Sequence, residues 1–425
     1  MNAALFMRSI ASFYVSTAPA EARRGSFWLL ARFAVLFIGW ISMPSALAAP
    51  SGPEPGLATL AIGDVAPDFK LPGIDGRTHT LADYKEAKIL MVAFISNHCP
   101  DSNATAPRLV AFANEMKKRG VAFVGINPNH PEGLSVDELG YSKYNDGFED
   151  MKRYAAEVKL PFPYLWDGET QATAKAYGCL TTPHIFIFDA ERRLRYKGQF
   201  DNSPYAQPDT IKTQDARAAI EAMLAGKPVQ VAETKPHGCS TKWRTKKESV
   251  EKRVARWDAE PVLVETADLA KIKALTTNAD GRFRLVNVWA TWCGPCVEEF
   301  PILVEAMRRF SMRPFDLITI SVDHPGQSKP VQEFLQGMNA GVPKRSHPAL
   351  KKEGRSTNHF LYSETDWQPL MQVLDPAWPG GVPHTVLLAP DGKILWRHSG
   401  ELDEQELIDQ LVDALGPYFS IGERG

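Results

Sequence analysis

The sequence has little of several features that would assign it to a functional class at once. Its formal net charge is −2 over 425 residues, and no basic stretch is interleaved with aromatic side chains. Such a charge balance offers no electrostatic footprint for nucleic acid and no acidic tail. Cysteine is scarce, with five residues, and no second Cys-x-x-Cys or histidine pair accompanies the single Cys-x-x-Cys to complete a zinc site. We therefore predict no nucleic-acid partner, no resident metal and no cofactor.

A long hydrophobic run is also lacking. Three arginines precede the apolar stretch from Phe33 to Ile41, and a small-residue exit follows that ends at Ala48. This order predicts a secretory signal over residues 1–49. The stretch is short for a membrane span, although counting back to Phe27 nearly suffices, so an uncleaved N-terminal anchor is the alternative. We expect a periplasmic or otherwise extracytoplasmic protein, with a membrane-anchored form as the second option.

The remaining length is enough for two domains. We place them at residues 57–227 and 261–418, joined by a charged linker or surface helix over 228–260 that carries Cys239. Each half repeats one order: buried strand, cysteine, helix, strand, then a proline and histidine before two further strands. A right-handed connection of parallel strands places the strands in one sheet. The fold class predicted is α/β, with two thioredoxin-fold domains, each a central mixed β-sheet flanked by helices.

Apolar periodicity predicts the elements of both halves. Strands are expected at 62–69, 71–77, 88–95, 121–126, 185–188, 194–197, 284–290, 315–322, 385–388 and 393–397. Helices are expected at 106–119, 148–158, 172–177, 211–224, 267–275, 297–310, 330–337, 366–374 and 404–415.

The segment Trp292–Cys296 carries the clearest chemical signal, because a buried strand delivers its two cysteines to the start of a helix. The helix N-terminus favours the thiolate of Cys293, which is therefore the expected nucleophile. Cys296 lies three residues further on and can displace a mixed disulfide made by Cys293. A metal half-site or two passive core cysteines are the alternatives, and redox chemistry is the interpretation we adopt.

Glu299 lies one turn beyond Cys296 on the same side of the predicted helix. A partly buried carboxylate there could move protons while the disulfide opens and closes. Acids are favoured in the first turns of a helix in any case, which is the structural explanation for both Glu298 and Glu299. We select Glu299 as the catalytic acid.

Residues 262–416 resemble the TlpA-like thiol:disulfide oxidoreductases of the thioredoxin superfamily. The resemblance is carried by the run Val286–Pro301, which includes the dithiol, and by Val382-Pro383. It implies an exported, periplasmic or membrane-tethered protein. Asn287 occupies the position of a buried aspartate in thioredoxins, as is common in this group, whose acid is the glutamate after the dithiol. The resemblance thus supports Glu299.

In a thioredoxin-type sheet the proline before the fourth strand is cis, lies against the dithiol, and leaves the preceding backbone able to pair with a substrate chain. This pattern predicts cis bonds at Val382-Pro383 and Thr182-Pro183, against the ordinary preference for trans. Both pairs, together with Trp292, are the predicted substrate-binding residues. An ordinary turn before a strand is the alternative.

Residues 57–245 resemble the redoxin (AhpC/TSA-like) branch of the same superfamily. The peroxiredoxin pattern of Pro, three residues, Thr, two residues and Cys is nevertheless absent, because Val92 and Ser96 stand at the first two places before Cys99. The resemblance is carried by Asn97–Pro100, Gly125–Asn127, Phe162–Asp167, Thr182–His184 and Gly238–Trp243.

Cys99 is predicted to be reactive, since it lies at a helix start beside His98. Ser102 stands where a second thiol would be, so a mixed disulfide at Cys99 needs another resolving cysteine. Cys179 and Cys239, the latter on an expected mobile tail, are the candidates. The alternatives are an inert buried Cys179 or a structural bridge between Cys179 and Cys239. His184 and His384 are interpreted as packing or capping residues.

These observations lead to the hypothesis of an exported thiol–disulfide oxidoreductase. Its Cys293/Cys296 dithiol would act as a reductant on protein disulfides or thiols, relay electrons to Cys99, and receive them from an exported or membrane electron donor. Hydroperoxides are a further substrate class for the first domain. One alternative is a client-binding first domain without peroxidase activity that presents proteins to the second. Metal chaperoning through the dithiol is a third hypothesis.

Overall fold

The computed structural model describes residues 56–278 and 280–421. The predicted signal or anchor over residues 1–49 therefore lies outside the described residues. Within the described part of the chain, every helix is too short or too polar to cross a membrane.

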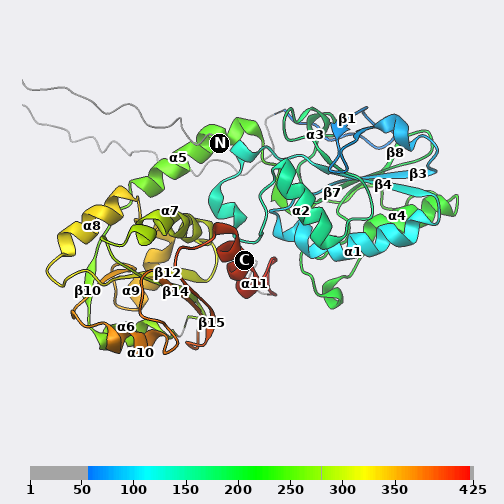
Figure 1. The fold of residues 1–425 in the computed structure, drawn as a ribbon. Helices are drawn as coiled ribbons and strands as arrows, with labels where there is room; N and C mark the ends of the chain where they lie inside the picture. The colour runs from blue at the N-terminus through cyan, green and yellow to red at the C-terminus, as the bar shows by residue number, and fades with distance from the viewer. Residues whose placement is uncertain (1–55, 279, 422–425) are drawn as a thin grey trace, which may run out of the picture. The chain divides into compact units, whose positions relative to one another are not determined.

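A five-stranded mixed sheet organises the first half of the chain (Figure 1). Its order is β5-β4-β3-β7-β8, with β3 parallel to β4 and antiparallel to β7. The strands are β3 (Ile89–Phe94), β4 (Val121–Asn127), β5 (Tyr164–Trp166), β7 (His184–Phe188) and β8 (Leu194–Gly198). The helices are α1 (Pro100–Lys117), α2 (Phe148–Val158), α3 (Ala172–Tyr177) and α4 (Asp215–Leu224).

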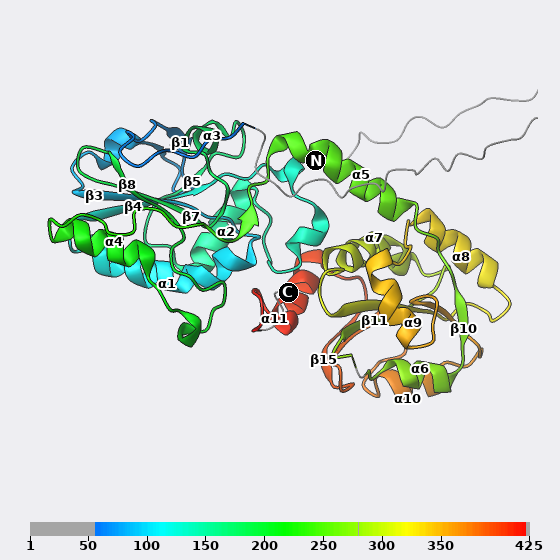
Figure 2. The same ribbon diagram turned by 180° about the vertical axis from the view of Figure 1, so that it is seen from behind.

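The central strand β3 is buried along its whole length, which explains its continuous apolar sequence. Because successive side chains alternate between the two faces, Met91 and Ala93 pack with α1, α2 and α4. On the other side of the sheet, Leu90 and Val92 pack with α3 and with residues 66–71. Figure 2 shows α1 and α4 on one side of this sheet and α3 on the other.

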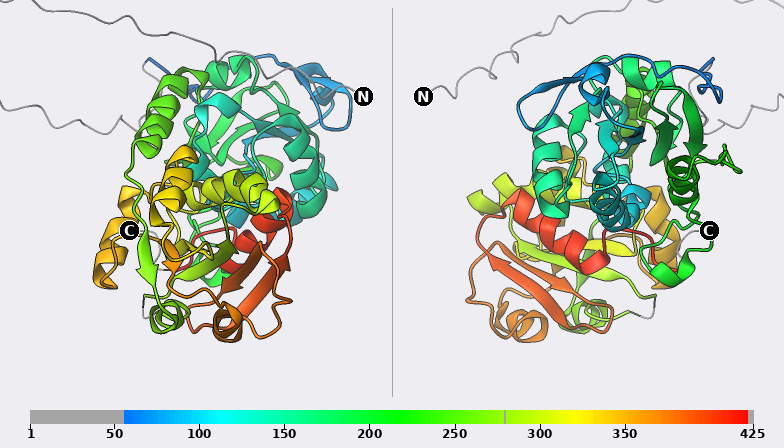
Figure 3. Two further views of the ribbon diagram at one scale, coloured as in Figure 1. Left: turned by 60° about the vertical axis from the view of Figure 1, so that its left-hand side comes forward. Right: turned by 90° about the vertical axis from the view of Figure 1, so that its right-hand side faces the viewer.

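A six-stranded mixed sheet organises the second half, in the order β10-β13-β12-β11-β14-β15. The C-terminal helix α11, red in Figure 3, packs on this sheet through Leu407 and Leu411. The strands are β10 (Glu265–Ala267), β11 (Phe283–Trp289), β12 (Phe315–Ser321), β13 (His359–Tyr362), β14 (His384–Leu388) and β15 (Ile394–Ser399). The helices are α6 (Leu269–Leu275), α7 (Gly294–Arg309), α8 (Ser328–Gly337), α9 (His347–Lys352), α10 (Gln368–Leu374) and α11 (Glu404–Leu415).

Both sheets follow the same plan. In the second sheet β11 is parallel to β12 and antiparallel to β14, as β3 is to β4 and β7 in the first. A cysteine at the end of the central strand begins a helix in each case, at α1 and at α7. The predicted α/β fold class is confirmed, with thioredoxin-type sheets flanked by helices.

Several predicted elements differ in the structure. The expected strands at 62–69 and 71–77 are wrong, because the hairpin is formed instead by β1 (Lys70–Pro72) and β2 (Thr78–Thr80). Strands β10 and β13 and helix α9 were not predicted. Each is short, and the two strands are defined by their pairing with neighbouring strands rather than by a local pattern.

Residues 228–260 are more structured than a charged linker. The surface helix that was one of the two expectations is α5 (Lys247–Asp258), which buries none of its residues. Ahead of it, β9 (Cys239–Ser240) pairs antiparallel with β6 (Thr181–Thr182). Cys239 therefore lies on a strand of a small two-stranded sheet and not on a mobile tail.

Candidate functional site

The dithiol of the second half lies where the sequence predicts, at the N-terminus of α7. Cys293 is the N-cap residue, and its Sγ accepts a hydrogen bond from the backbone N–H of Cys296 at 3.3 Å. The two sulfurs are joined in a disulfide of 2.05 Å. Cys293 retains 6% exposure and Cys296 none. An incoming thiolate therefore has access to Cys293 rather than to Cys296, in accord with the predicted order of attack.

The predicted substrate-binding residues of this half surround Cys293. The Val382-Pro383 bond is cis, and the carbonyl oxygen of Val382 lies 3.5 Å from the Cys293 Sγ. Trp292, next to the dithiol, is 60% exposed and presents a large apolar side chain to solvent. The site thus combines one reachable sulfur, a backbone edge and an exposed aromatic surface.

Glu299 lies on α7 itself, and its side chain is completely buried. Burial raises the pKa of its carboxyl to about 7, although hydrogen bonds to the carboxylate oppose the shift. Asn287 Nδ2 donates to Oε1 at 2.8 Å, and the backbone N–H of Leu402 donates to Oε2 at 3.1 Å. Glu298 is exposed. Of the two glutamates, only Glu299 therefore has the environment of a proton carrier at neutral pH.

Cys99 occupies the equivalent place in the first half, as the N-cap residue of α1. It is fully buried, and its Sγ donates to the carbonyl oxygen of Thr182 at 2.9 Å. The Thr182-Pro183 bond is cis, as predicted. Burial raises the pKa of the Cys99 thiol, but the hydrogen bonds from Cys239 and the nearby His98 outweigh it, so the pKa lies below its ordinary value.

A buried carboxylate that sequence reasoning missed holds the loop before Cys99. Asp146 Oδ2 lies 2.5 Å from Nδ1 of His98, and both side chains have no exposure. Asp146 Oδ1 also accepts the backbone N–H of Asn97 at 2.8 Å, and Oδ2 accepts from Asn129 Nδ2 at 2.7 Å. Its place between β4 and α2, within a polar loop, gave no periodic signal that could have identified it.

The two candidate resolving cysteines have different surroundings. Cys179 is fully buried in the apolar core, and burial raises the pKa of its thiol to about 12. Cys239 is half-buried, and its backbone N–H donates to the Cys99 Sγ at 3.4 Å. Cys99, Cys179 and Cys239 are all in the thiol form, so the alternative of a Cys179–Cys239 bridge is not formed in this structure.

One group of side chains in the described residues has the spacing of a metal site, which the sequence did not predict. The ligand atoms of Cys99, Asp101 and Cys239 lie within 4.8 Å of one another. Asp101 Oδ1 is also 3.1 Å from Nδ1 of His237. Two thiolates and a carboxylate are ligands that zinc accepts.

The two histidines after the cis prolines have packing environments. His184 is buried against Phe186, with ring centroids 4.4 Å apart, and burial lowers its pKa to about 3. His384 stacks on Trp378, with centroids 4.8 Å apart. Burial also lowers the pKa of His384, although Asp375 Oδ2, 3.3 Å from its Nε2, opposes the shift.

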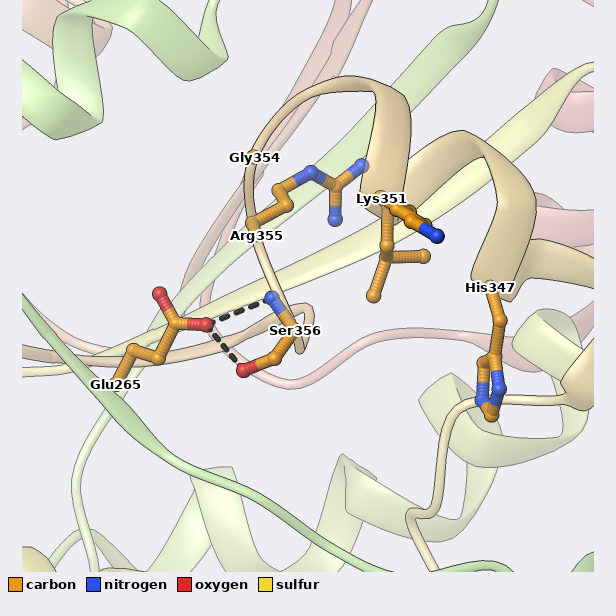
Figure 4. A pocket seen from close by; sticks show the side chains of 7 residues that line it. Glu265, His347, Lys351, Gly354, Arg355 and Ser356 are labelled. Atoms are coloured by element: carbon orange, nitrogen blue, oxygen red, sulfur yellow. Dashed lines mark hydrogen bonds between the residues drawn. The ribbon is translucent and has the colours of Figure 1, made fainter.

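A pocket of about 570 Å³ in the second half has no cysteine among the residues that line it (Figure 4). Within it, Glu265 Oε1 accepts from the backbone N–H and the Oγ of Ser356 at 2.8 and 2.5 Å. The remaining residues that line it are His347, Leu350, Lys351, Gly354 and Arg355. Nothing in this pocket adds to the thiol chemistry.

Comparison with known families finds a match for the segment that contains Cys99. Residues 62–197, which contain β3, Cys99, α1 and the Thr182-Pro183 bond, match the model of the AhpC/TSA family. This segment is an AhpC/TSA family domain. The redoxin resemblance seen in the sequence is thereby confirmed for the first half.

Named relatives add to this comparison. The chain is 25% identical to the thiol-disulfide oxidoreductase ResA of Bacillus subtilis (strain 168) over 155 residues, which are 36% of this chain and 72% of ResA. It is 36% identical to the peroxiredoxin Bcp of Escherichia coli (strain K12) over 76 residues, or 18% of this chain and 49% of Bcp.

A solved structure also resembles this chain. It is that of a hypothetical protein from Sinorhizobium meliloti 1021, with 37% sequence identity. The match covers 44% of this chain and 96% of that protein, with a TM-score of 0.39.

The relatives confirm the enzyme class. Homology to proteins named thiol-disulfide oxidoreductase and peroxiredoxin makes this chain, with its AhpC/TSA domain, an oxidoreductase of the thiol–disulfide type. The roles of individual residues are not given by these comparisons and stay predictions.

Proposed function

We propose that the protein exchanges disulfides through Cys293 and Cys296 and acts as a reductant. The observation that carries this proposal is the Cys293–Cys296 disulfide at the start of α7, with only Cys293 reachable and the buried Glu299 on the same helix. A single accessible sulfur backed by a shielded one is suited to attack and resolution in a fixed order.

The exchange is a two-electron transfer in two steps. The Cys293 thiolate attacks one sulfur of a client disulfide; that S–S bond breaks, and the other client sulfur leaves as a thiolate that takes up a proton. Glu299, with its pKa of about 7, accepts the proton of Cys296 as a carboxylate. The Cys296 thiolate then attacks Cys293 Sγ, which releases the second client thiolate. The client is reduced, and the Cys293–Cys296 disulfide is formed.

The substrate-binding roles of Trp292 and of the two cis-proline segments belong to the same proposal. Val382 presents a backbone carbonyl beside Cys293, and the exposed Trp292 offers apolar contact area for a client chain. In the AhpC/TSA domain, a client chain could use Thr182 and Pro183 only if β9, which pairs with Thr182, gave way. Disulfides and thiols of proteins are accordingly the proposed substrates.

In its sharper form, the proposal has Cys293 reduce an oxidised Cys99. Replacing Cys296 by Ser removes the resolving thiol, so the intermediate should accumulate as a Cys99–Cys293 crosslink. We expect intact mass and peptide mapping of the oxidised Cys296→Ser chain to show this crosslink, and the Cys99→Ser, Cys296→Ser chain to lack it. Repeated mapping without any Cys99–Cys293 peptide would refute the relay.

A second candidate function treats the AhpC/TSA domain as a client-binding module without peroxidase activity. The full burial of Cys99 and the presence of Val92 and Ser96 in place of the peroxiredoxin Pro and Thr favour it. It requires that Cys99→Ser leave disulfide turnover unchanged and that substitution of Thr182 weaken client capture. Consumption of a hydroperoxide that depends on Cys99 would exclude it.

We also propose that the chain acts outside the cytoplasm, through the signal or anchor expected over residues 1–49. The apolar stretch and its small-residue exit support this location. An exported or membrane protein would then supply the electrons. Recovery of the native chain in a cytoplasmic fraction with its N-terminus intact would contradict export.

A further inference from the structure

The backbone beside Pro183 is already paired with another part of the chain. Strand β9 runs antiparallel to β6, and Cys239 lies opposite Thr182 in the register. In the second half, Val382 belongs to no strand. Among the described residues, the hydrogen-bond partner of its carbonyl oxygen is the Cys293 sulfur. The backbone before Pro183 therefore has residues 239–240 as a paired strand, whereas the backbone before Pro383 has no such strand in the part of the chain that the structure describes.

This pairing brings the Cys239 thiol to the Cys99 thiol. Their sulfurs lie within 4.8 Å of each other, and the Cys239 N–H donates to the Cys99 Sγ at 3.4 Å. The interaction between the two side chains raises the pKa of the Cys239 thiol and lowers that of the Cys99 thiol. One sulfur is thus prepared as a nucleophile and the other as its proton-bearing neighbour.

The segment that carries Cys239 is held firmly. Gly238 passes so close to the first half that an added Cβ would lie 2.1 Å from the carbonyl oxygen of Thr182. After β9, the backbone N–H of Lys242 donates to Asn129 Oδ1 at 2.8 Å, and Trp243 is only 2% exposed. The contact between the two sulfurs is therefore built into the fold.

Cys179 has no comparable relation to Cys99. Its Sγ lies 3.4 Å from the carbonyl oxygen of Thr181 and 3.5 Å from Thr241 Oγ1, within the apolar core. It has no exposure and lacks a hydrogen bond to either of the other thiols among the described residues. Of the two candidates for resolving Cys99, the geometry selects Cys239.

We propose that Cys99 and Cys239 form a second reversible dithiol–disulfide centre, in which β9 occupies the cis-proline edge as an internal substrate strand. This inference does not depend on the exchange proposed for Cys293 and Cys296, because it concerns thiols of the first half alone. The Cys99 and Cys239 thiols would be oxidised to a disulfide while they reduce a disulfide of the glutathione or cysteinyl class.

The reaction balances with such a disulfide as the oxidant. The Cys99 thiolate attacks one sulfur of R–S–S–R, the S–S bond breaks, and the departing thiolate takes the proton of Cys239. The Cys239 thiolate then attacks the Cys99 Sγ and expels the second RS⁻, which is protonated by solvent. Two thiols have lost two electrons and two protons in total, and R–S–S–R has become two RSH.

The experiment uses the full chain with Cys293→Ala and Cys296→Ala, so that only Cys99, Cys179 and Cys239 can react. The reduced protein is treated with oxidised glutathione, alkylated under denaturing conditions, and mapped by mass spectrometry. We expect a Cys99–Cys239 disulfide, alkylated Cys179 and no retained glutathione. With Cys239→Ser added, Cys99 should keep glutathione as a stable mixed disulfide.

Gly238→Ala gives a second test that leaves all thiols in place. The added Cβ must push β9 away from Thr182, so we expect closure of the Cys99–Cys239 bond to slow by about tenfold or more. Gly337→Ala is the matched control, because an added Cβ there meets no atom within 4 Å. It should leave the closure rate unchanged.

Three results would overturn the proposal. They are glutathione retained on Cys99 while Cys239 is present, a Cys99–Cys179 bond in place of Cys99–Cys239, and a stoichiometric zinc ion. In the last case the reduced chain would bind one zinc that protects Cys99 and Cys239 from glutathione and is lost on Cys239→Ser. The cluster with Asp101 would then be a metal site and not a redox centre.

Discussion

At the scale of single residues, burial decides which acid near the dithiol can take part in proton transfer. Glu298 and Glu299 are neighbours on α7, but one faces solvent and the other has no exposure. Burial raises the pKa of Glu299 toward neutral pH, while Asn287 and Leu402 donate hydrogen bonds that hold the carboxylate in place. Such a group can both accept and return a proton near pH 7.

The raised pKa of Glu299 predicts a stability change with pH. Its pKa is 4.5 in the unfolded reference and about 7 when folded, so the folded chain binds more protons in this window. The contribution to stability is fully present below pH 4.5 and is lost as pH rises through about 7. At 1.36 kcal/mol per pKa unit, the change is about 3 kcal/mol.

Glu299→Gln removes this titration. In urea unfolding of the oxidised chain, we expect the variant to gain about 3 kcal/mol relative to wild type between about pH 4 and about pH 8. The control Glu298→Gln, at an exposed position, should follow the wild-type pH profile. Parallel profiles for Glu299→Gln and wild type would contradict the assignment of the shift.

At the scale of elements, the sequence predicted the strand–cysteine–helix units well, because buried strands and amphipathic helices have strong periodicity. The predicted helix 148–158 coincides with α2, and the predicted strand 284–290 differs from β11 by one residue at each end. The cis bonds at both X-Pro positions were also correctly predicted. These features depend on local sequence or on a repeated order of elements.

The elements that the sequence did not predict are those defined by tertiary contact. Strand β9 has only two residues, so no alternation could mark it, and its partner β6 is equally short. Asp146 was missed for a similar reason, since its role arises from the convergence of His98, Asn97 and Asn129 around a loop residue. The sequence offered both Cys179 and Cys239 as resolving cysteines. The structure distinguishes them, because Cys239 contacts Cys99 and Cys179 lies in the apolar core.

Trp243 provides a test of how β9 is anchored. Its side chain is 2% exposed and packs in the core of the first half, so Trp243→Ala should cost about 3–5 kcal/mol of unfolding free energy. Loss of this anchor should also speed alkylation of Cys99 in the folded chain. Trp292→Ala is the stability control, since that side chain is 60% exposed, and it should change the free energy by under about 0.5 kcal/mol. Equal effects of the two substitutions would contradict the anchoring role.

At the scale of the whole molecule, two thioredoxin-type sheets carry two different versions of one cysteine site. The second half has both thiols on the dithiol helix, whereas the first has Cys99 on α1 and Cys239 on a separate strand, with Ser102 at the place of the second thiol. The duplicated plan explains why both halves have a cysteine N-cap and a cis proline. It also makes an electron relay between them a chemically consistent proposal.

The direction of that relay depends on the reduction potential of Cys293 and Cys296. A reductant of the thioredoxin type has a potential near about −270 mV, whereas a strong oxidant lies near about −120 mV. Equilibration of the wild-type full chain in dithiothreitol buffers, followed by differential alkylation and quantification of the Cys293–Cys296 peptide, measures this potential. We predict a single two-electron transition with a midpoint below about −200 mV. A midpoint near about −120 mV, or cysteines that do not interconvert between dithiol and disulfide, would contradict the proposed reductant function.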